Sequence, residues 1–140
     1  MANAMYNSYK DACIEGRILY LTEDMNVFLV TSTYTVDVDA HTMFSNITNE
    51  VVGTGYTANG ATLASKTSTQ DNTNNRGVMD AADVTWSAST ITARAAGIMQ
   101  WTGTASTSEL VCYIDFGADK SSSSSDFTIT WHTDGILYLG

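Results

Sequence analysis

Two histidines and a few nearby carboxylates are the side chains of this sequence that could carry out acid–base chemistry. His41 follows Asp37 and Asp39 at alternating positions, a spacing that can bring an imidazole and carboxylates together. Neither a G-x-S-x-G nor an H-E-x-x-H motif supplies a nucleophile or a metal site beside them. We therefore interpret His41 as a loop residue, and His132, on the Thr side of an expected strand, as an exposed strand residue.

Another set of polar side chains alternates as calcium ligands do: Asp71, Thr73 and Asn75. An EF-hand loop also needs Gly at its sixth position and Glu at its twelfth, where this chain has Arg76 and Ala82. We expect a polar hairpin turn here. A surface cation shared with Asp80 or Asp83 is the alternative.

Three glycines lie close together, at Gly53, Gly55 and Gly60. A phosphate-binding loop would continue with Lys and then Ser or Thr, but Ala61 and Thr62 follow. The glycines therefore predict a turn-rich connection.

Three tryptophans could stack on sugars: Trp86, Trp101 and Trp131. Trp131 shares a strand face with Phe127 and Ile129, which favours the core, whereas Trp101 ends a strand beside a turn and is the best candidate for an exposed contact. The two cysteines, Cys13 and Cys112, are too few for a disulfide scaffold and are expected to be free thiols. The residues thus indicate no catalytic, cofactor-binding or metal site.

The composition narrows the class of protein. The chain has 140 residues, the length of one domain, and only 15% are charged against a usual value of about 25%. Thr and Ser fill the difference. Six Lys and Arg stand singly against 15 Asp and Glu, giving a net charge of −9, which disfavours nucleic acid and anionic membranes as partners. Since we find neither a secretory signal nor a spanning segment, we expect synthesis and assembly in a reducing cytoplasm.

The elements that would position these residues are mostly strands. Helical spacing predicts a helix over Asn7–Glu15, ended by Gly16. Apolar runs at 18–21 and 27–30 around a polar turn predict a hairpin, and a short helical turn is expected within 41–47. Further strands are expected at 61–70, 77–80, 84–86, 90–99, 110–116, 127–131 and 136–139, with 118–125 as a loop.

We therefore predict an all-β fold, mainly antiparallel, as a β-sandwich or barrel-like domain with one short N-terminal helix. Residues 1–140 form a single β domain, and residues 1–16 form an N-terminal arm with the short helix. We expect the segment from Met1 to Tyr9 to be too polar to pack alone. The alternation predicts a core of Val27, Leu29, Leu110, Cys112, Ile114, Phe116, Phe127, Ile129 and Trp131.

Several strings along nearly the whole chain resemble small proteins of tailed bacteriophages, in the same order. They are VGTGYTANGATL (52–63), DVTW (83–86), TITAR (90–94), YIDFG (113–117), FTITW (127–131) and DGIL (134–137). The chain departs from the resemblance at 99–101. Because such proteins are described as virion-associated, the resemblance implies a virion component, and it supplies no catalytic residues.

The resulting hypothesis is a bacteriophage capsid decoration or cement protein, not an enzyme. It would bind the major capsid protein or other virion proteins, act as a homo-oligomer without cofactors, and reside in the virion. The alternatives are a tail or neck adaptor or fibre module, and a receptor- or carbohydrate-binding module.

Overall fold

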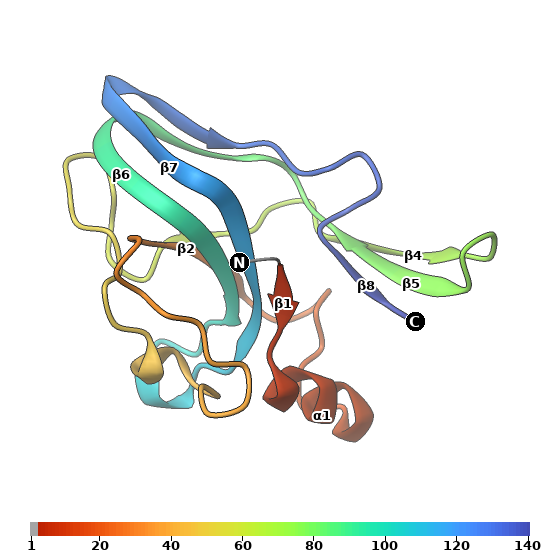
Figure 1. Cartoon of the computed structure of the whole chain (residues 1–140). Coiled ribbons are helices and arrows are strands. Elements are labelled where there is room, and N and C mark those ends of the chain that lie inside the picture. The colour runs from red at the N-terminus through yellow and green to blue at the C-terminus, as the bar shows by residue number, and fades with distance from the viewer. Residues whose placement is uncertain (1–2) are drawn as a thin grey trace.

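The computed structural model describes residues 3–140. Strands are the main regular structure of this part of the chain, as Figure 1 shows. The elements are β1 (Ala4–Met5), α1 (Asn7–Glu15), β2 (Met25–Val30), the 3-10 helix η1 (Phe44–Asn46), β3 (Ala61–Thr62), β4 (Thr67–Asp71), β5 (Arg76–Asp80), β6 (Val84–Gln100), the 3-10 helix η2 (Ala105–Thr107), β7 (Leu110–Ile129) and β8 (Leu137–Leu139).

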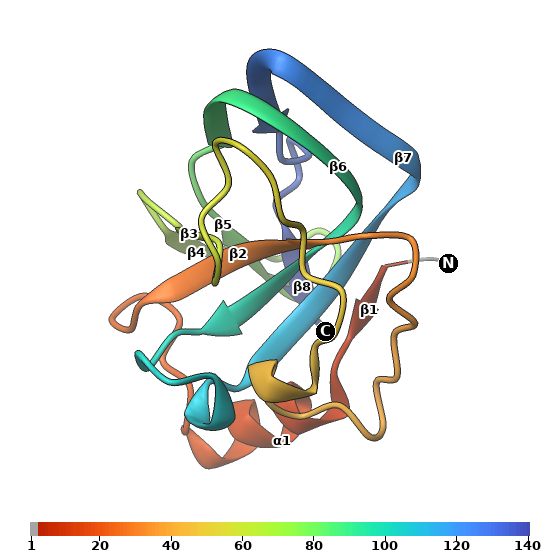
Figure 2. The ribbon, with the colours of Figure 1, turned by 90° about the vertical axis from the view of Figure 1, so that its left-hand side faces the viewer.

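The strands form two antiparallel sheets. One has the order β1-β7-β6-β2-β3 and the other has the order β4-β5-β8. The long strands β6 and β7 pair along most of their length and bend strongly, so that the ribbon arches over the space between the sheets (Figures 1 and 2). The predicted fold class is confirmed: mainly antiparallel β in a sandwich-like arrangement, with one short helix near the N-terminus.

The larger sheet is buried on both faces near β2. Val27 and Leu29 point into a core shared with the second sheet and α1, whereas Phe28 and Val30 point into a second core under the 31–48 segment. All six residues of β2 are buried, which explains why its last four residues, 27–30, form a continuous apolar run. No helix in the described part of the chain is long and apolar enough to span a membrane.

The helix α1 has the predicted bounds. Gly16 at its end adopts φ 68°, and its neighbour Arg17 donates its backbone N–H to the carbonyl of Ala12 at 2.9 Å. Tyr9 and Ala12 are buried against the first core. The expected helical turn after His41 is η1, which places Phe44 in the second core.

The predicted strand at 18–21 is wrong. Ile18 and Tyr20 are buried, but the N–H groups of Thr22 and Glu23 both donate to the carbonyl of Leu19, which closes a turn. The apolar run of this segment supplies two anchoring side chains, Ile18 and Tyr20, to an irregular connection that pairs with no strand among the described residues.

The predicted loop at 118–125 is also wrong, because β7 continues through it. The Ser121 hydroxyl bonds the Thr92 hydroxyl at 2.8 Å, and the buried Ser122 hydroxyl bonds that of Ser89 at 2.7 Å. Cross-strand hydroxyl pairs therefore support a polar strand that composition alone suggests is a loop. Likewise, β6 runs unbroken from Val84 to Gln100, with register shifts where two separate strands were expected.

A register shift between Ile98 and Met99 also changes the faces of β7. It places Leu110 in the second core with Tyr113, whereas Cys112 points into the first core. Leu110 and Cys112 therefore do not share a face, contrary to the simple alternation.

The N-terminal segment packs on its own chain. Ala4 pairs with Tyr113 and Met5 with Cys112, and Tyr6 is fully buried. The Tyr6 hydroxyl lies 2.9 Å from the Tyr34 hydroxyl. The expectation of a segment too polar to pack alone is therefore wrong from residue 4 onward; residues 1–2 lie outside the described part.

Candidate binding groove

An open groove of about 710 Å³ runs beside the second half of β7. Its lining residues come mainly from β7 and from the segment that leads to β8, whose course Figure 1 shows. Its lining comprises Asn3, Ile114, Phe116, Lys120, Ser121, the run 126–132, Gly135, Ile136 and Tyr138.

The groove exists because the first core is left open at this edge of the sheet. Within residues 3–140, β1 covers β7 only opposite Cys112 and Tyr113. Beyond that point Phe116, Trp131 and Ile136 pack against the core but stay partly exposed. An apolar floor that continues the interior of the domain is thus available to a partner.

The wall of the groove is the edge of a strand. Successive side chains of a strand point to opposite faces of the sheet, yet every residue from Asp126 to His132 lines the groove. Phe127 and Ile129 are buried, whereas Thr128 and Thr130 are exposed. Since both sets border the same hollow, the backbone of this stretch faces it.

The aromatic floor is held in place. The indole Nε1 of Trp131 donates to the carbonyl of Ala82 at 2.9 Å, and its backbone N–H donates to Oδ1 of Asp83 at 2.9 Å. The rings of Phe116 and Phe127 lie 6.3 Å apart. The groove is therefore largely formed before any ligand arrives.

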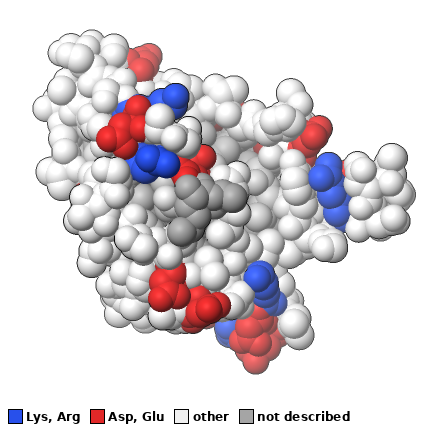
Figure 3. Space-filling view, in the orientation of Figure 1, with Lys and Arg blue, Asp and Glu red and all other residues white. Residues whose placement is uncertain are grey.

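The rim is polar and carries both signs of charge. Asp126 accepts a hydrogen bond from the backbone N–H of Ala88 at 3.1 Å, and Lys120 lines the groove nearby. His132 is exposed, and its Nδ1 lies 3.6 Å from Oδ2 of Asp134. Figure 3 shows the Lys and Arg on this face as separate groups with acidic residues beside them.

His41 lies on the other face of the sheet, away from this lining. Its Nδ1 lies 2.8 Å from the Tyr34 hydroxyl, and the two rings stack. Asp37 accepts the backbone N–H groups of Ala40 and Asp39, which lower its pKa. The polar groups around His41 thus form a turn and a tyrosine contact, in agreement with the loop interpretation.

The expected turn at 71–75 is confirmed. Asp71 accepts hydrogen bonds from the side-chain amide of Asn74 at 2.7 Å and from Nε of Arg76 at 2.8 Å, which lower its pKa to about 2. Its oxygens therefore bind the hairpin itself. Among residues 3–140, no group of three His, Cys, Asp or Glu side chains is placed to hold a metal ion.

The three glycines lie at close backbone approaches. A Cβ on Gly60 would lie 1.9 Å from the carbonyl oxygen of Val27, and one on Gly53 would lie 2.5 Å from that of Thr90. They let the 50–60 segment pack on β2 and β6, as a turn-rich connection.

Both cysteines are free thiols. Cys112 is 1% exposed, and burial raises its pKa to about 12.

The three tryptophans differ in how far they are buried. Trp86 is buried, whereas Trp101 is only partly buried and packs edge-on against Phe44 at 6.3 Å between ring centroids. The tryptophan at the groove is Trp131.

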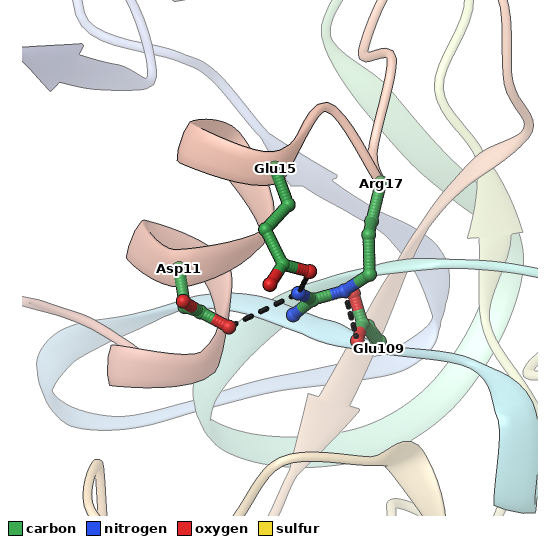
Figure 4. A network of polar contacts seen from close by, with 4 residues as sticks. All are labelled: Asp11, Glu15, Arg17 and Glu109. Atoms are coloured by element: carbon green, nitrogen blue, oxygen red, sulfur yellow. Dashed lines mark hydrogen bonds and ion pairs between the residues drawn. The ribbon is translucent and has the colours of Figure 1, made fainter.

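Two ion-pair clusters escaped the sequence analysis because their members are far apart in the chain. Figure 4 shows Arg17 between Asp11 and Glu15 of α1 and Glu109, which precedes β7; its Nε lies 3.3 Å from Oε1 of Glu109. The pairs with Asp11 and Glu15 are exposed and contribute little to stability, whereas the pair with the largely buried Glu109 connects the helix to the sheet.

The second cluster borders a small pocket of about 220 Å³ on the opposite face. Nε of Arg94 donates to Oδ1 of Asp115 at 2.9 Å, and this contact lowers the pKa of Asp115. Tyr34 and Tyr113 complete one side of the pocket.

The groove itself also escaped prediction, because it depends on how far β1 extends along β7. One signal was present in the sequence: the strings at 113–117, 127–131 and 134–137 all contribute to its lining.

Comparison with protein families, with curated proteins and with solved structures found no match for this chain.

Proposed function

We propose that this chain is a structural protein of a tailed-bacteriophage virion that decorates the head shell. One observation carries the proposal. Three of the strings that resemble phage virion proteins, at 113–117, 127–131 and 134–137, meet in space and line one groove. Residues far apart in the chain are thus brought together at a surface suited to another protein.

The physical character of the chain supports the same proposal. Its net charge of −9 favours solubility at the high concentration that a protein needed in many copies must reach. A protein that binds only the assembled shell stabilises it by RT ln(1 + [L]/Kd) and needs no catalytic group. The partner is the major capsid protein or a neighbouring virion protein, and the decorating unit is a homo-oligomer.

The test is binding to separated virion parts. Heads and tails are purified from a phage that lacks the gene for this chain, and each is sedimented with the purified protein. The proposal predicts saturable binding to heads and none to tails. Binding to tails or necks alone would favour the adaptor alternative, and binding to neither would contradict a structural role.

The carbohydrate-binding alternative now depends on a different residue. Trp101 is partly buried against Phe44 and does not line the groove, whereas Trp131 and Tyr138 line it together with the polar side chains of Thr130 and His132. Aromatic and polar groups side by side are typical of sugar sites. Binding of the isolated protein to immobilised glycans, lost on Trp131→Ala, would favour this function over decoration.

A further inference from the structure

We propose that the outer edge of β7 from Asp126 to Thr128 is a strand-addition site for an extended segment of another polypeptide. The preceding stretch is not part of the site, because Ser124 is left-handed at φ 46° and the N–H groups of Ser123 and Ser124 already donate to Oγ of Ser125 and Oγ1 of Thr90. The segment would carry apolar side chains at every second position and a net positive charge. Its identification with a virion protein rests on the proposed function; the site itself does not.

The cross-strand contacts indicate which peptide groups face the groove. In an antiparallel ladder, opposed residues alternate between pairs bonded to each other and pairs whose peptide groups face outward, and the outward pairs have the closer side chains. The hydroxyls of Thr85 and Thr128 lie 2.9 Å apart, and those of Thr92 and Ser121 lie 2.8 Å apart. Both pairs fit the outward-facing kind.

A backbone hydrogen bond on the edge of β6 that faces away from β7 supports this assignment for the Thr92–Ser121 pair. The peptide groups of Thr90 and Thr92 point in the same direction, because the two residues are two positions apart on β6. The N–H of Thr90 points away from β7, since it donates to the carbonyl of Thr54 at 2.9 Å. By the same alternation, the peptide groups of Ser121, which pairs with Thr92, face away from β6; register shifts separate this part of the ladder from Thr128, whose orientation follows from its own pairing with Thr85. Ser121 and Thr128 both line the groove.

The chain already uses this edge once. β1 adds antiparallel to β7 at Cys112 and Tyr113, and the side chain of Asn3 accepts the N–H of Asp115 at 2.9 Å. A second segment would continue the same edge, giving its backbone hydrogen bonds to β7 and its alternate side chains to Phe116, Trp131 and Ile136.

Charge and shape favour a different protein over a second copy. Two copies at −9 each repel at long range, whereas a basic segment is attracted. Of the edges of the smaller sheet that a second copy offers, β4 reads Thr-Ser-Thr-Gln-Asp and has no apolar side chain for the floor, and β8, which reads Leu-Tyr-Leu, spans only three residues. The charge repulsion between two copies therefore favours a segment of another chain as the occupant.

The test selects ligands without using virions. A random library of peptides about twelve residues long is displayed on ribosomes and selected on the immobilised full chain. We expect enriched peptides with alternating apolar residues and Lys or Arg, whose affinity falls at least tenfold when every second amide is N-methylated. Absence of enrichment, or equal binding after N-methylation, would overturn the proposal.

Matched proline variants locate the site. Thr128→Pro removes an N–H that faces the groove. Thr85→Pro, at the β6 residue paired with Thr128, removes an N–H that points away from β7 and from the groove. Both variants lose the hydroxyl contact between Thr85 and Thr128, so they are matched in that respect. The selected peptide should lose at least tenfold in affinity for the Thr128 variant and keep it for the Thr85 variant; equal affinity for both would overturn the site.

A measurement on the unchanged protein covers the case in which a proline variant does not fold. Peptide binding should slow amide hydrogen exchange within 118–131, and unchanged exchange there would also overturn the proposal. Particle binding separates the two proposals. If the Thr128→Pro variant binds heads as the unchanged protein does, the strand-addition site is wrong and the decoration function is kept. If peptides bind the groove but the unchanged protein does not bind heads, the decoration function is wrong and the strand-addition site is kept.

Discussion

At the scale of single residues, one partly buried tyrosine connects the glycine-rich segment to the sheet. The Tyr56 hydroxyl accepts the backbone N–H of Leu29 at 3.0 Å and donates to Oε1 of Glu50 at 2.7 Å, and the N–H of Asn59 donates to the same oxygen at 2.8 Å. Burial raises the pKa of Tyr56, so the hydroxyl stays protonated at neutral pH. The segment that carries the longest string of the phage resemblance is thus fixed by three hydrogen bonds.

Tyr56→Phe removes the hydroxyl. The backbone N–H of Leu29 then loses its acceptor, and the Glu50 carboxylate loses one of its donors. We expect a loss of about 1–3 kcal/mol in the free energy of unfolding, because unsatisfied buried groups are costly. Urea unfolding measures it, with Tyr138→Phe on exposed β8 as the control. Equal stability of the two variants would contradict the connecting role.

Glu50 makes stability depend on pH. Burial raises its pKa, opposed by the hydrogen bonds from Tyr56 and Asn59. A carboxyl with a raised folded-state pKa contributes stability below its unfolded pKa of about 4.3 and loses it as pH rises through the folded value. Hence the stability of the parent should fall relative to Glu50→Gln over that window. Parallel stability–pH curves for the two proteins would show that Glu50 does not titrate abnormally.

At the scale of elements, local signals predicted what local interactions determine. Helix α1 and the 71–75 turn follow from Gly16 and from Asp71, whose effects act within a few residues. The continuation of β7 through five serines could not be predicted, because Ser121 and Ser122 are held by β6 residues about thirty positions away. The end of β1, which creates the groove, is likewise a long-range property.

The predicted core illustrates the same limit. Six of its nine members are buried, but Ile114, Phe116 and Trp131 are only partly so. Alternation identifies the face that a side chain occupies; it does not indicate whether the neighbouring element extends far enough to cover it. These three residues line the groove, so the incomplete burial coincides with the candidate site.

The segment at β1 should contribute to folding. Tyr6 is fully buried and bonds Tyr34, so Tyr6→Ala should cost about 3–5 kcal/mol through lost burial and the cavity left behind. Ile14→Ala, at a residue 87% exposed in α1, should change stability by less than about 0.5 kcal/mol. Thermal and urea unfolding compare them, and a small loss for Tyr6→Ala would contradict the packing of this segment on its own chain.

At the scale of the whole molecule, two sheets share a core that is closed on the β3 side by Val51 and Leu63 and open along β7. Apolar burial is worth about 25 cal/mol per Å² and persists in salt, whereas exposed ion pairs are weak and screened. An acidic protein with such an opening is suited to hold a partner through its strand edge and its apolar floor.

The whole molecule should be indifferent to reductant. Cys13 and Cys112 are free, and Cys112 is buried with a raised pKa, so neither a disulfide nor a reactive thiolate supports the fold. The thermal midpoint should be the same with and without dithiothreitol. A midpoint that drops on reduction would show that a disulfide stabilises the protein.

The central claim is that this chain decorates the head shell, and its copy number in purified virions tests that claim most directly. The amount of the chain relative to the major capsid protein is measured by quantitative mass spectrometry with labelled peptides of both. The decoration role predicts a stoichiometry near that of the capsid subunits, hundreds of copies in each particle. A value of about a dozen would place the chain at the neck or tail, and its absence from virions would contradict the account.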